Sequence, residues 1–309
     1  MGAVVQTARL RAAARSITTA LRNPQARAPW FFIAVPTLII MVFHALPAVV
    51  SLVLSLYDYD GVSTINYYGA RNYGKMLDDP LFVNGILVTA YYTIGSVVPT
   101  LLLSLLVAVV LNSAWFPAKS AFRAAYFMPT VVSLVAIALV WQWLLHPNFG
   151  LVNDLLRVVG VPPQQFLGNP LLAMPTLIAI SVWRGIGYDA VIFLAGLQGI
   201  SQTYYEAAEI DGASRWALFR YITWPLLMPT TLFVLVIGVI RGFQVFDLVY
   251  VMTGGGPVNA TRVIVWYIWH RAFQTLDMGY ASAMAVVLFL IILFFTLLQF
   301  RLVGRHAEY

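Results

Sequence analysis

Six long apolar stretches dominate this chain and constrain what it can fold into. A transmembrane helix needs about 20 consecutive, mostly apolar residues, and the stretches that reach this length are residues 30–56, 82–111, 124–145, 171–198, 225–253 and 279–303. The chain is 61% hydrophobic and only 10% charged, whereas soluble domains carry about 25% charged residues. The sequence therefore predicts an all-α polytopic membrane protein with six transmembrane helices.

A basic leader precedes the first apolar stretch. It spans residues 1–29 and contains five arginines. The stretch that follows is too long for the h-region of a secretory signal peptide, which is about 7–15 residues, so we expect it to be retained as the first span. Residues 30–303 are expected to form one transmembrane domain, followed by a short cytoplasmic tail over residues 304–309.

Basic residues outside the apolar stretches predict the orientation. When the leader, the tail and alternate loops are taken together, one side of the membrane receives eleven Lys and Arg residues and the other side five. Cytoplasmic loops carry an excess of Lys and Arg, which places both termini in the cytoplasm. The same bias puts the loop between the fourth and fifth stretches, residues 199–224, on the cytoplasmic side.

This cytoplasmic loop is polar and bent. Thr203 and Glu206 have the spacing of a capping box, which predicts a helix that starts at Thr203. Gly212 then interrupts the pattern as a helix-ending glycine does, and a second helical segment is expected over residues 214–223. From the residues alone, the loop is either an ordinary amphipathic connector on the membrane surface or a binding surface for another protein.

Four charged residues lie inside the predicted spans: Arg184 and Asp189 in the fourth, Arg241 and Asp247 in the fifth. Each costs about 2.5–3.5 kcal/mol near the bilayer centre, so we expect them to face the bundle interior, to pair, or to line a wet cavity. Two interpretations stay open. The charges form salt bridges that lock the two spans together, or they line the pathway of a polar substrate.

Glycine and aromatic residues surround these charges. Gly185 and Gly187 follow Arg184, and Gly242 follows Arg241. Glycine permits close helix packing or a broken helix at a transport site. The aromatic and amide residues beside these glycines are Trp183, Tyr188, Phe243, Gln244 and Phe246. Aromatic faces with a few hydrogen-bonding groups suit sugar rings, and the simpler interpretation is that these rings pack in the core or against lipid.

The chemistry that this chain could carry by itself is limited. It has no cysteine, which excludes disulfides, thiol nucleophiles and cysteine-based metal sites. It has no G-x-x-x-x-G-K-[ST] motif to cradle the phosphates of ATP, and its four histidines lack the spacing of metal ligands. Its basic residues do not form one stripe, which argues against nucleic acid as a partner. We therefore expect no catalytic residue, metal or cofactor on this chain.

A resemblance to a known family gives the cytoplasmic loop a function. The letters EAA at residues 206–208 and DGA at 211–213 resemble the EAA loop of ABC importer permeases. Three further segments are similar to carbohydrate importers of the maltose and glycerol-phosphate type: WRGIGYDAVIFLAGLQGIS (183–201), FQVFDLVYVMTGGGP (243–257) and YASAMAVVLFLII (280–292). The resemblance covers most of the chain beyond the leader.

The resemblance implies an ABC type I importer permease fold. In this family the EAA segment forms a cytoplasmic coupling helix that docks on an ATPase subunit. Closure of two ATPases, which bind ATP and Mg²⁺, then moves a pair of permeases between inward-open and outward-open states, and an extracytoplasmic binding protein delivers the sugar. The chain is thus expected to be a non-catalytic, multi-pass subunit of a bacterial or archaeal plasma membrane. Its partners would be lipid, a second permease, two ATPases and the binding protein.

Two sets of residues are assigned by position. The ATPase-coupling set consists of Glu206, Ala207, Ala208, Asp211 and Gly212. The part of the substrate-pathway set that matches the family consists of Gly185, Tyr188, Gly238, Gly242 and Gln244. The residues added to this second set for their charge or aromatic ring are Trp183, Arg184 and Asp247.

The chain departs from the maltose permease in two respects. With six predicted spans it lacks the extra N-terminal spans and the large periplasmic insertion of that relative. The polar amides that the relative uses in its fifth span are here Gly242 and Val245, which argues against maltose itself as the substrate. The alternative function is an ion-coupled secondary transporter that uses Asp189 and Asp247 as proton or Na⁺ sites, although no inverted repeat of the kind common in such transporters is visible.

Overall fold

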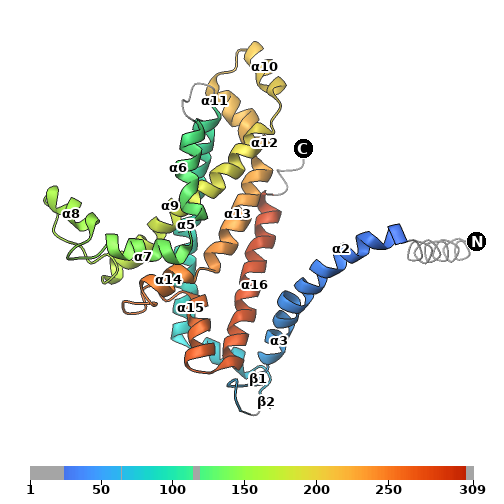
Figure 1. The fold of residues 1–309 in the computed structure, drawn as a ribbon, viewed down its shortest axis with the longest axis vertical. Coiled ribbons are helices and arrows are strands. Elements are labelled where there is room, and N and C mark those ends of the chain that lie inside the picture. Colours follow the sequence, from blue (N-terminus) through green and yellow to red (C-terminus); the bar gives the residue numbers. More distant parts are fainter. Residues whose placement is uncertain (1–23, 64, 114–118, 304–309) are drawn as a thin grey trace, which may run out of the picture. The chain divides into compact units, whose positions relative to one another are not determined.

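The computed structural model describes residues 24–63, 65–113 and 119–303, and these residues are mostly helical (Figure 1). The chain divides into two compact units, residues 1–54 and 55–309. Among the described residues, five helices are long and apolar enough to cross a membrane, and six spans result if one bent pair counts as a span. The all-α prediction is therefore confirmed. Most of the predicted leader and the whole predicted tail lie outside the described residues.

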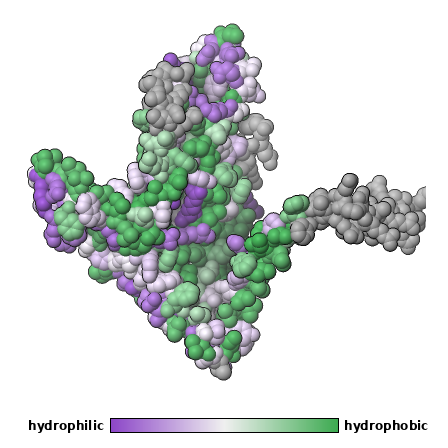
Figure 2. Space-filling view, in the orientation of Figure 1, coloured by the Kyte–Doolittle hydropathy of each residue, from purple (hydrophilic) through white to green (hydrophobic). Residues whose placement is uncertain are grey.

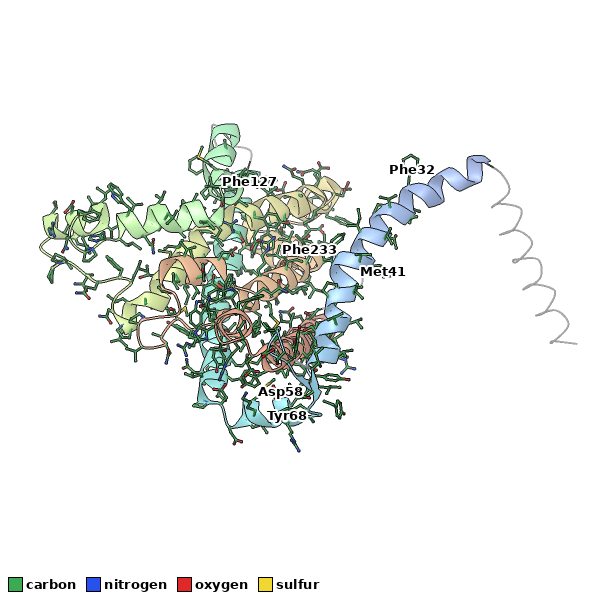
Figure 3. All side chains as sticks on the ribbon, turned by 60° about the horizontal axis from the view of Figure 1, so that its bottom comes forward. Phe32, Met41, Asp58, Tyr68, Phe127 and Phe233 are labelled. Carbon is green, nitrogen blue, oxygen red and sulfur yellow. The ribbon has the colours of Figure 1, made fainter. Side chains whose placement is uncertain are left out.

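The first unit is one long helical segment within the described residues. It consists of α2 (Pro24–Ile40), the five-residue π-helix η1 (Met41–Ala45) and α3 (Leu46–Leu54). Phe32 and Met41 project from it and are exposed (Figure 3). Exposed apolar side chains suit a helix whose solvent is lipid. The segment contains a candidate span of 23 residues, which confirms the first predicted span.

The second unit is a helical bundle with a small pair of strands at one end. The two-residue strands β1 (Tyr57–Asp58) and β2 (Asn66–Tyr67) run antiparallel, with Tyr57 opposite Tyr67; Asp58 and Tyr68 mark this region in Figure 3. We call this the strand end, and the opposite end, which carries α10 (Gln202–Ile210), the α10 end (Figure 1). The long helices of this unit are α5 (Pro80–Asn112), α9 (Pro170–Gln198), α13 (Met228–Phe243) and α16 (Met278–Val303). The shorter elements are α4 (Arg71–Leu77), α6 (Lys119–Val131), α7 (Leu134–Leu144), α8 (Leu151–Val158), α11 (Arg215–Leu218), η2 (Phe219–Thr223), α12 (Trp224–Leu226), α14 (Asp247–Met252), α15 (Ile264–Trp269) and η3 (His270–Gln274).

The third predicted span is not one straight helix. The apolar parts of α6 and α7 meet at an angle of 105°. Between them Ser133 has φ −54° and ψ 133°, which lies outside the helical region and interrupts the hydrogen-bond ladder. The single helix expected over residues 124–145 is therefore corrected to a bent pair.

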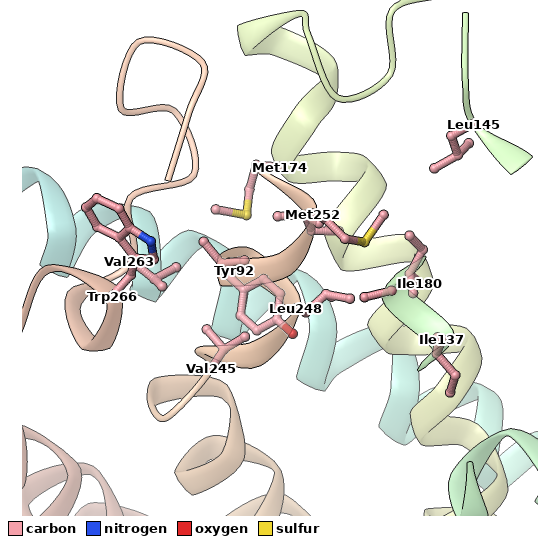
Figure 4. Packing of buried hydrophobic residues seen from close by; sticks show 13 residues of the cluster. Tyr92, Ile137, Leu145, Met174, Ile180, Val245, Leu248, Met252, Val263 and Trp266 are labelled. Carbon is pink, nitrogen blue, oxygen red and sulfur yellow. The ribbon is translucent and has the colours of Figure 1, made fainter. Parts of the chain in front are cut away.

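Helices α5 and α9 pack along each other at the centre of the second unit. A buried cluster surrounds them and includes Tyr92 of α5, Met174 of α9 and Leu248 of α14 (Figure 4). Gly187 lets α9 approach α6 closely, because a Cβ at this position would collide with the carbonyl oxygen of Tyr126. These contacts hold α9 in place against α5, α6 and α14.

A hydrogen-bond network at the strand end ties α5 to α15 and α16. Asp79 is the N-cap of α5, and its carboxylate accepts a hydrogen bond from the Leu81 backbone amide at 2.9 Å. The hydroxyl groups of Tyr267 and Tyr280 also donate to it, at 2.7 and 2.8 Å, and Arg271 Nη2 lies 3.6 Å away. Burial disfavours the charged form, but the hydrogen bonds outweigh burial and hold the pKa of Asp79 below its ordinary value.

This network predicts a loss of stability in acid. Because the folded-state pKa of Asp79 is lowered, its ionised form stabilises the fold fully above the unfolded-state pKa of about 3.9. That contribution is lost as the pH falls through the folded-state pKa. We expect Asp79→Asn to lower the free energy of unfolding at neutral pH by about 1–3 kcal/mol and to weaken its dependence on pH below about 4. Thermal unfolding of the detergent-solubilised protein at a series of pH values measures both effects.

The neighbouring Asp78→Asn is the matched control. Asp78 is exposed and forms no ion pair among the residues that the structure describes, so its substitution should leave both quantities unchanged. An acid dependence in Asp79→Asn equal to that of the wild type would show that Asp79 is not the group responsible.

Candidate functional site

A cavity of about 390 Å³ lies in the second unit where three long helices meet a break in the fifth span. Its volume falls within the range of about 300–1,000 Å³ found for small-molecule sites. Figure 2 shows a hydrophilic area midway along an otherwise largely hydrophobic face of the molecule. The polar residues and glycines that line the cavity are Tyr92, Ser96, Thr100, Ser181, Arg184, Gly185, Asp189, Gly238, Arg241, Gly242, Gln244 and Asp247.

Helical spacing explains why these residues meet. Residues four apart lie on one face of a helix, and each of the three helices contributes such a set. The sets are Tyr92, Ser96 and Thr100 on α5, Ser181, Gly185 and Asp189 on α9, and Val234, Gly238 and Gly242 on α13. The fifth span stops at Phe243 and restarts as α14 at Asp247. This break places Gln244 and Asp247 at the cavity wall.

Arg241 and Asp189 form an ion pair between α13 and α9. Arg241 Nη1 lies 3.9 Å from Asp189 Oδ1, and the Asp189 side chain is only 11% exposed. The Arg241 guanidinium also lies 4.3 Å from the ring centroid of Tyr188, a cation–π distance. This pair supports the interpretation in which a salt bridge connects the fourth and fifth spans.

Arg184 and Asp247 are arranged differently. Neither forms an ion pair in the part of the chain that the structure describes, and Arg184 Nε is buried there without a hydrogen-bond partner. An unpaired guanidinium and an unpaired carboxylate at a cavity wall are compatible with a polar substrate pathway. The role of Arg184 and Asp247 in such a pathway stays a prediction. Within the described ranges, no group of three or more His, Asp or Glu side chains is placed to hold a metal ion.

The glycines of the predicted pathway serve helix packing. A Cβ at Gly242 would lie 2.7 Å from Thr93 Cγ2, and a Cβ at Gly185 would lie 3.0 Å from Thr100 Cγ2. Gly238 faces α5 in the same way. These glycines border the cavity because they let α9 and α13 approach α5 closely.

Two predicted pathway residues do not line the cavity. Trp183 is exposed and packs edge-on against Trp141 of α7, with ring centroids 5.6 Å apart. Tyr188 contacts the Arg241 guanidinium instead. Both are neighbours of cavity residues in the sequence, but the 3.6-residue turn directs them to other faces of α9. The six predicted residues that do line it are Arg184, Gly185, Gly238, Gly242, Gln244 and Asp247.

Sequence reasoning missed the contribution of α5. The hydroxyl groups of Tyr92 and Ser181 are hydrogen-bonded at 2.5 Å and connect α5 to α9. Ser96 Oγ donates to the Tyr92 carbonyl at 2.7 Å, which satisfies its hydroxyl within the helix. A row of hydroxyl residues at helical spacing between Thr89 and Ser104, in an otherwise apolar stretch, could have indicated that α5 lines a polar cavity.

The loop between α9 and α13 projects from the α10 end (Figure 1). Helix α10 begins after Ser201, whose hydroxyl accepts a hydrogen bond from the Thr203 amide at 3.4 Å. The capping box predicted at Thr203 and Glu206 is therefore wrong, because the residue with extended backbone at this helix start is Ser201. The second helical segment is present as α11 and η2, and Ser214 is its N-cap.

Gly212 ends α10 with a Schellman motif. Its φ is +80°, a conformation that costs other L-residues about 1–2 kcal/mol. The Ala213 amide donates to the Ala208 carbonyl at 2.9 Å, and the Gly212 amide donates to the Glu209 carbonyl at 3.0 Å. The predicted bend at this glycine is confirmed.

The surface around α10 is exposed and mixed in character. Of the five residues in the ATPase-coupling set, four are exposed and Ala208 is half-buried. Ile210 and Trp216 are also exposed, at 87% and 70%. Large apolar side chains beside carboxylates suit a contact with another protein. The docking role itself stays a prediction.

Comparison with known proteins identifies the family. The family model described as "binding-protein-dependent transport system inner membrane component" matches residues 7–307. This chain belongs to that family. The permease is 32% identical over 294 residues to the trehalose/maltose transport system permease protein MalF of Thermococcus litoralis, covering 95% of this chain and 99% of that protein. It is 33% identical over 276 residues to the lactose transport system permease protein LacF of Rhizobium radiobacter, covering 88% and 92%.

A further relative and a solved structure agree with this assignment. The permease is 31% identical over 288 residues to the sn-glycerol-3-phosphate transport system permease protein UgpA of Agrobacterium fabrum, covering 91% and 96%. It superposes with a TM-score of 0.80 on a chain of a bacterial alginate ABC transporter that was crystallised with an alginate pentasaccharide-bound periplasmic protein. That match has 22% identity and covers 92% of this chain and 96% of the other, so it shows the fold. None of these matches supports the ion-coupled alternative.

Proposed function

We propose that this permease is a transmembrane subunit of an ATP-driven importer for a sugar or sugar derivative. The observation that carries the proposal is that three transport permeases match this chain along nearly their whole length. Their names specify trehalose/maltose, sn-glycerol 3-phosphate and lactose. The named substrates differ from one another, so a class rather than one sugar is proposed. The hydroxyl, amide and charged groups of the cavity suit a hydroxylated substrate.

Helix α10 is proposed to be the coupling helix. Its exposure, its bend at Gly212 and its place at one end of the bundle support this role. The exposed Glu206 forms no ion pair among the described residues, so its carboxylate is available to a basic partner. In this scheme two ATPase subunits bind ATP with Mg²⁺ and hydrolyse it, and the permease is non-catalytic. The α10 end and both termini then lie in the cytoplasm, as the excess of basic residues favours.

A second permease would complete the translocation pathway, of which this chain forms half. The family description, which specifies dependence on a binding protein, supports delivery of the substrate by such a protein at the strand end. The cavity in the middle of the bundle then lies between the site of delivery and the site of ATP hydrolysis. The unpaired Arg184 and Asp247 are proposed to contact the substrate there.

Purification of the native complex tests this function. We expect the chain to co-purify with an ATP-hydrolysing subunit and a second permease. Proteoliposomes of the complex should take up radiolabelled trehalose, lactose or glycerol 3-phosphate only when ATP and the binding protein are both supplied. A chain that never associates with an ATPase, or that transports these probes on an ion gradient alone, would overturn the proposal.

A further inference from the structure

Helix α14 has one face in the core and an opposite face that continues the cavity. Val249 and Met252 are buried, at 0% and 5% exposure, and neither lines the cavity. Asp247 and Tyr250 are three residues apart and lie on the opposite side of the helix. Asp247 lines the cavity, and Tyr250 is 46% exposed. The exposed face of α14 therefore leads from the cavity toward Tyr250.

Three aromatic rings cover the place where this face leaves the cavity. Phe246 lines the cavity and stacks on Tyr250, with ring centroids 5.2 Å apart and planes inclined by 25°. Trp269 of α15 lies 5.9 Å from Phe246 and 4.8 Å from Tyr250 between ring centroids. None of the three side chains is buried. Together they form a partly exposed aromatic surface that begins at the cavity wall.

The surrounding structure holds this surface in place. The first amide of α15, that of Ile264, donates to Thr89 Oγ1 of α5 at 2.8 Å. Trp266 is 8% exposed and supports Trp269 from the core side, with ring centroids 6.2 Å apart. A surface that is arranged before binding loses little conformational freedom when a ligand arrives.

We propose that Phe246, Tyr250 and Trp269 form a saccharide subsite beside the central cavity. The subsite receives one sugar ring of an oligosaccharide while the cavity holds the adjacent ring. This inference rests on the proposed sugar function. The aromatic faces match the apolar C–H faces of a sugar ring, and the Asp247 carboxylate and the Tyr250 hydroxyl provide hydrogen-bond partners for its hydroxyl groups.

The continuity with the cavity favours a saccharide over a protein as the occupant. Phe246 belongs to both surfaces, so a ligand that extends beyond the cavity in this direction meets the rings first. The carboxylate of Asp247 lies at the junction and forms no ion pair in the described part of the chain. Contact with the second permease is the competing occupant, and the test below separates the two.

Ligand titration of the purified importer complex tests the subsite. The probes are maltotriose and arabinotriose, compared with glucose and arabinose, and the readout is intrinsic tryptophan fluorescence. We expect a trisaccharide to change the emission of the wild type and Trp269→Phe to remove most of that change. Tyr250→Ala should raise the dissociation constant for the trisaccharide roughly tenfold and leave that for a monosaccharide unchanged. Tyr250→Phe keeps the ring and loses only the hydroxyl, so it should raise the trisaccharide constant less, about threefold.

Matched controls come from the same chain. Trp143 of α7 is 59% exposed and Tyr221 is 75% exposed, and neither lines the central cavity. Trp143→Phe should keep the fluorescence change, and Tyr221→Ala should keep the affinity. Three results would overturn the subsite. The first is an equal loss of affinity for monosaccharides and trisaccharides in Tyr250→Ala, and the second is an unchanged tryptophan emission of the wild type with either trisaccharide. The third is loss of the second permease from the Tyr250→Ala complex.

ATP-dependent uptake separates failure of the subsite from failure of the proposed function. If the wild-type complex imports a sugar and Tyr250→Ala binds every probe as the wild type does, the subsite alone is wrong. If the wild-type complex imports no sugar, the sugar function is wrong and the subsite is wrong with it.

Discussion

Charge reversal at Glu206 is expected to abolish ATP-driven uptake while the permease still folds and inserts. Glu206 is exposed and makes no ion pair among the described residues, so Glu206→Lys removes no internal contact of this kind. On the proposed docking surface it places a like charge opposite a basic group of the ATPase. Loss of such a charged contact costs about 2–5 kcal/mol, equivalent to a roughly thirtyfold or greater loss of ATPase association. Co-purification of the ATPase and uptake by proteoliposomes measure the effect.

Asp78→Lys is the matched charge reversal for this test. Asp78 is an exposed acidic residue between α4 and α5, and this segment lies at the strand end, away from α10 (Figure 1). It should leave association of the ATPase unchanged. Normal uptake and normal ATPase binding in Glu206→Lys would contradict the docking role of α10.

The bend at Gly212 provides a second way to perturb the same surface. A Cβ at Gly212 would meet no atom within 4 Å, so the cost of substitution comes from the backbone, whose φ is +80°. Gly212→Val should disturb the end of α10 and reduce ATPase association, whereas Gly212→Asn should retain it because asparagine tolerates this conformation better than other L-residues. Equal behaviour of the two variants would show that the bend does not matter for docking.

Neutralisation of Arg184 is expected to reduce uptake at least tenfold without reducing the amount of assembled permease. Arg184 lines the cavity, and its Nε is buried without a hydrogen-bond partner among the described residues. A hydrogen bond to a charged group contributes about 1.5–3 kcal/mol, so Arg184→Gln should weaken substrate binding roughly ten- to hundredfold. Uptake rates in proteoliposomes, divided by the amount of folded complex, give the effect per transporter.

Arg241→Gln is the comparison that separates transport from folding. The half-exposed Arg241 pairs with the buried Asp189 at 3.9 Å, and leaving a buried polar group without its partner costs about 1–3 kcal/mol. We therefore expect Arg241→Gln to reduce the amount of folded permease, measured by size-exclusion chromatography in detergent. If Arg184→Gln instead lowers abundance and keeps normal uptake per molecule, Arg184 is a structural residue.

The bend in the cytoplasmic loop could be predicted because its cause is local. A glycine just past the end of a helix commonly takes a positive φ because it has no Cβ, and Gly212 does so. The N-cap of the same helix was predicted two residues too late, at Thr203 instead of Ser201, because both are acceptable N-caps and the sequence does not decide between them.

The helical spans, the bend at Gly212 and the need to compensate four intramembrane charges could be predicted from the amino-acid pattern alone. The tertiary structure sets which helix faces meet. It bent the third span at Ser133, turned Trp183 away from the cavity and joined Tyr92 to Ser181, 89 residues later in the chain. The inward faces could not be predicted because the solvent around the spans is lipid. In lipid the outer and inner faces of a transmembrane helix are both largely apolar. An apolar pattern therefore predicts the length of the helix, and helix packing decides which face points inward.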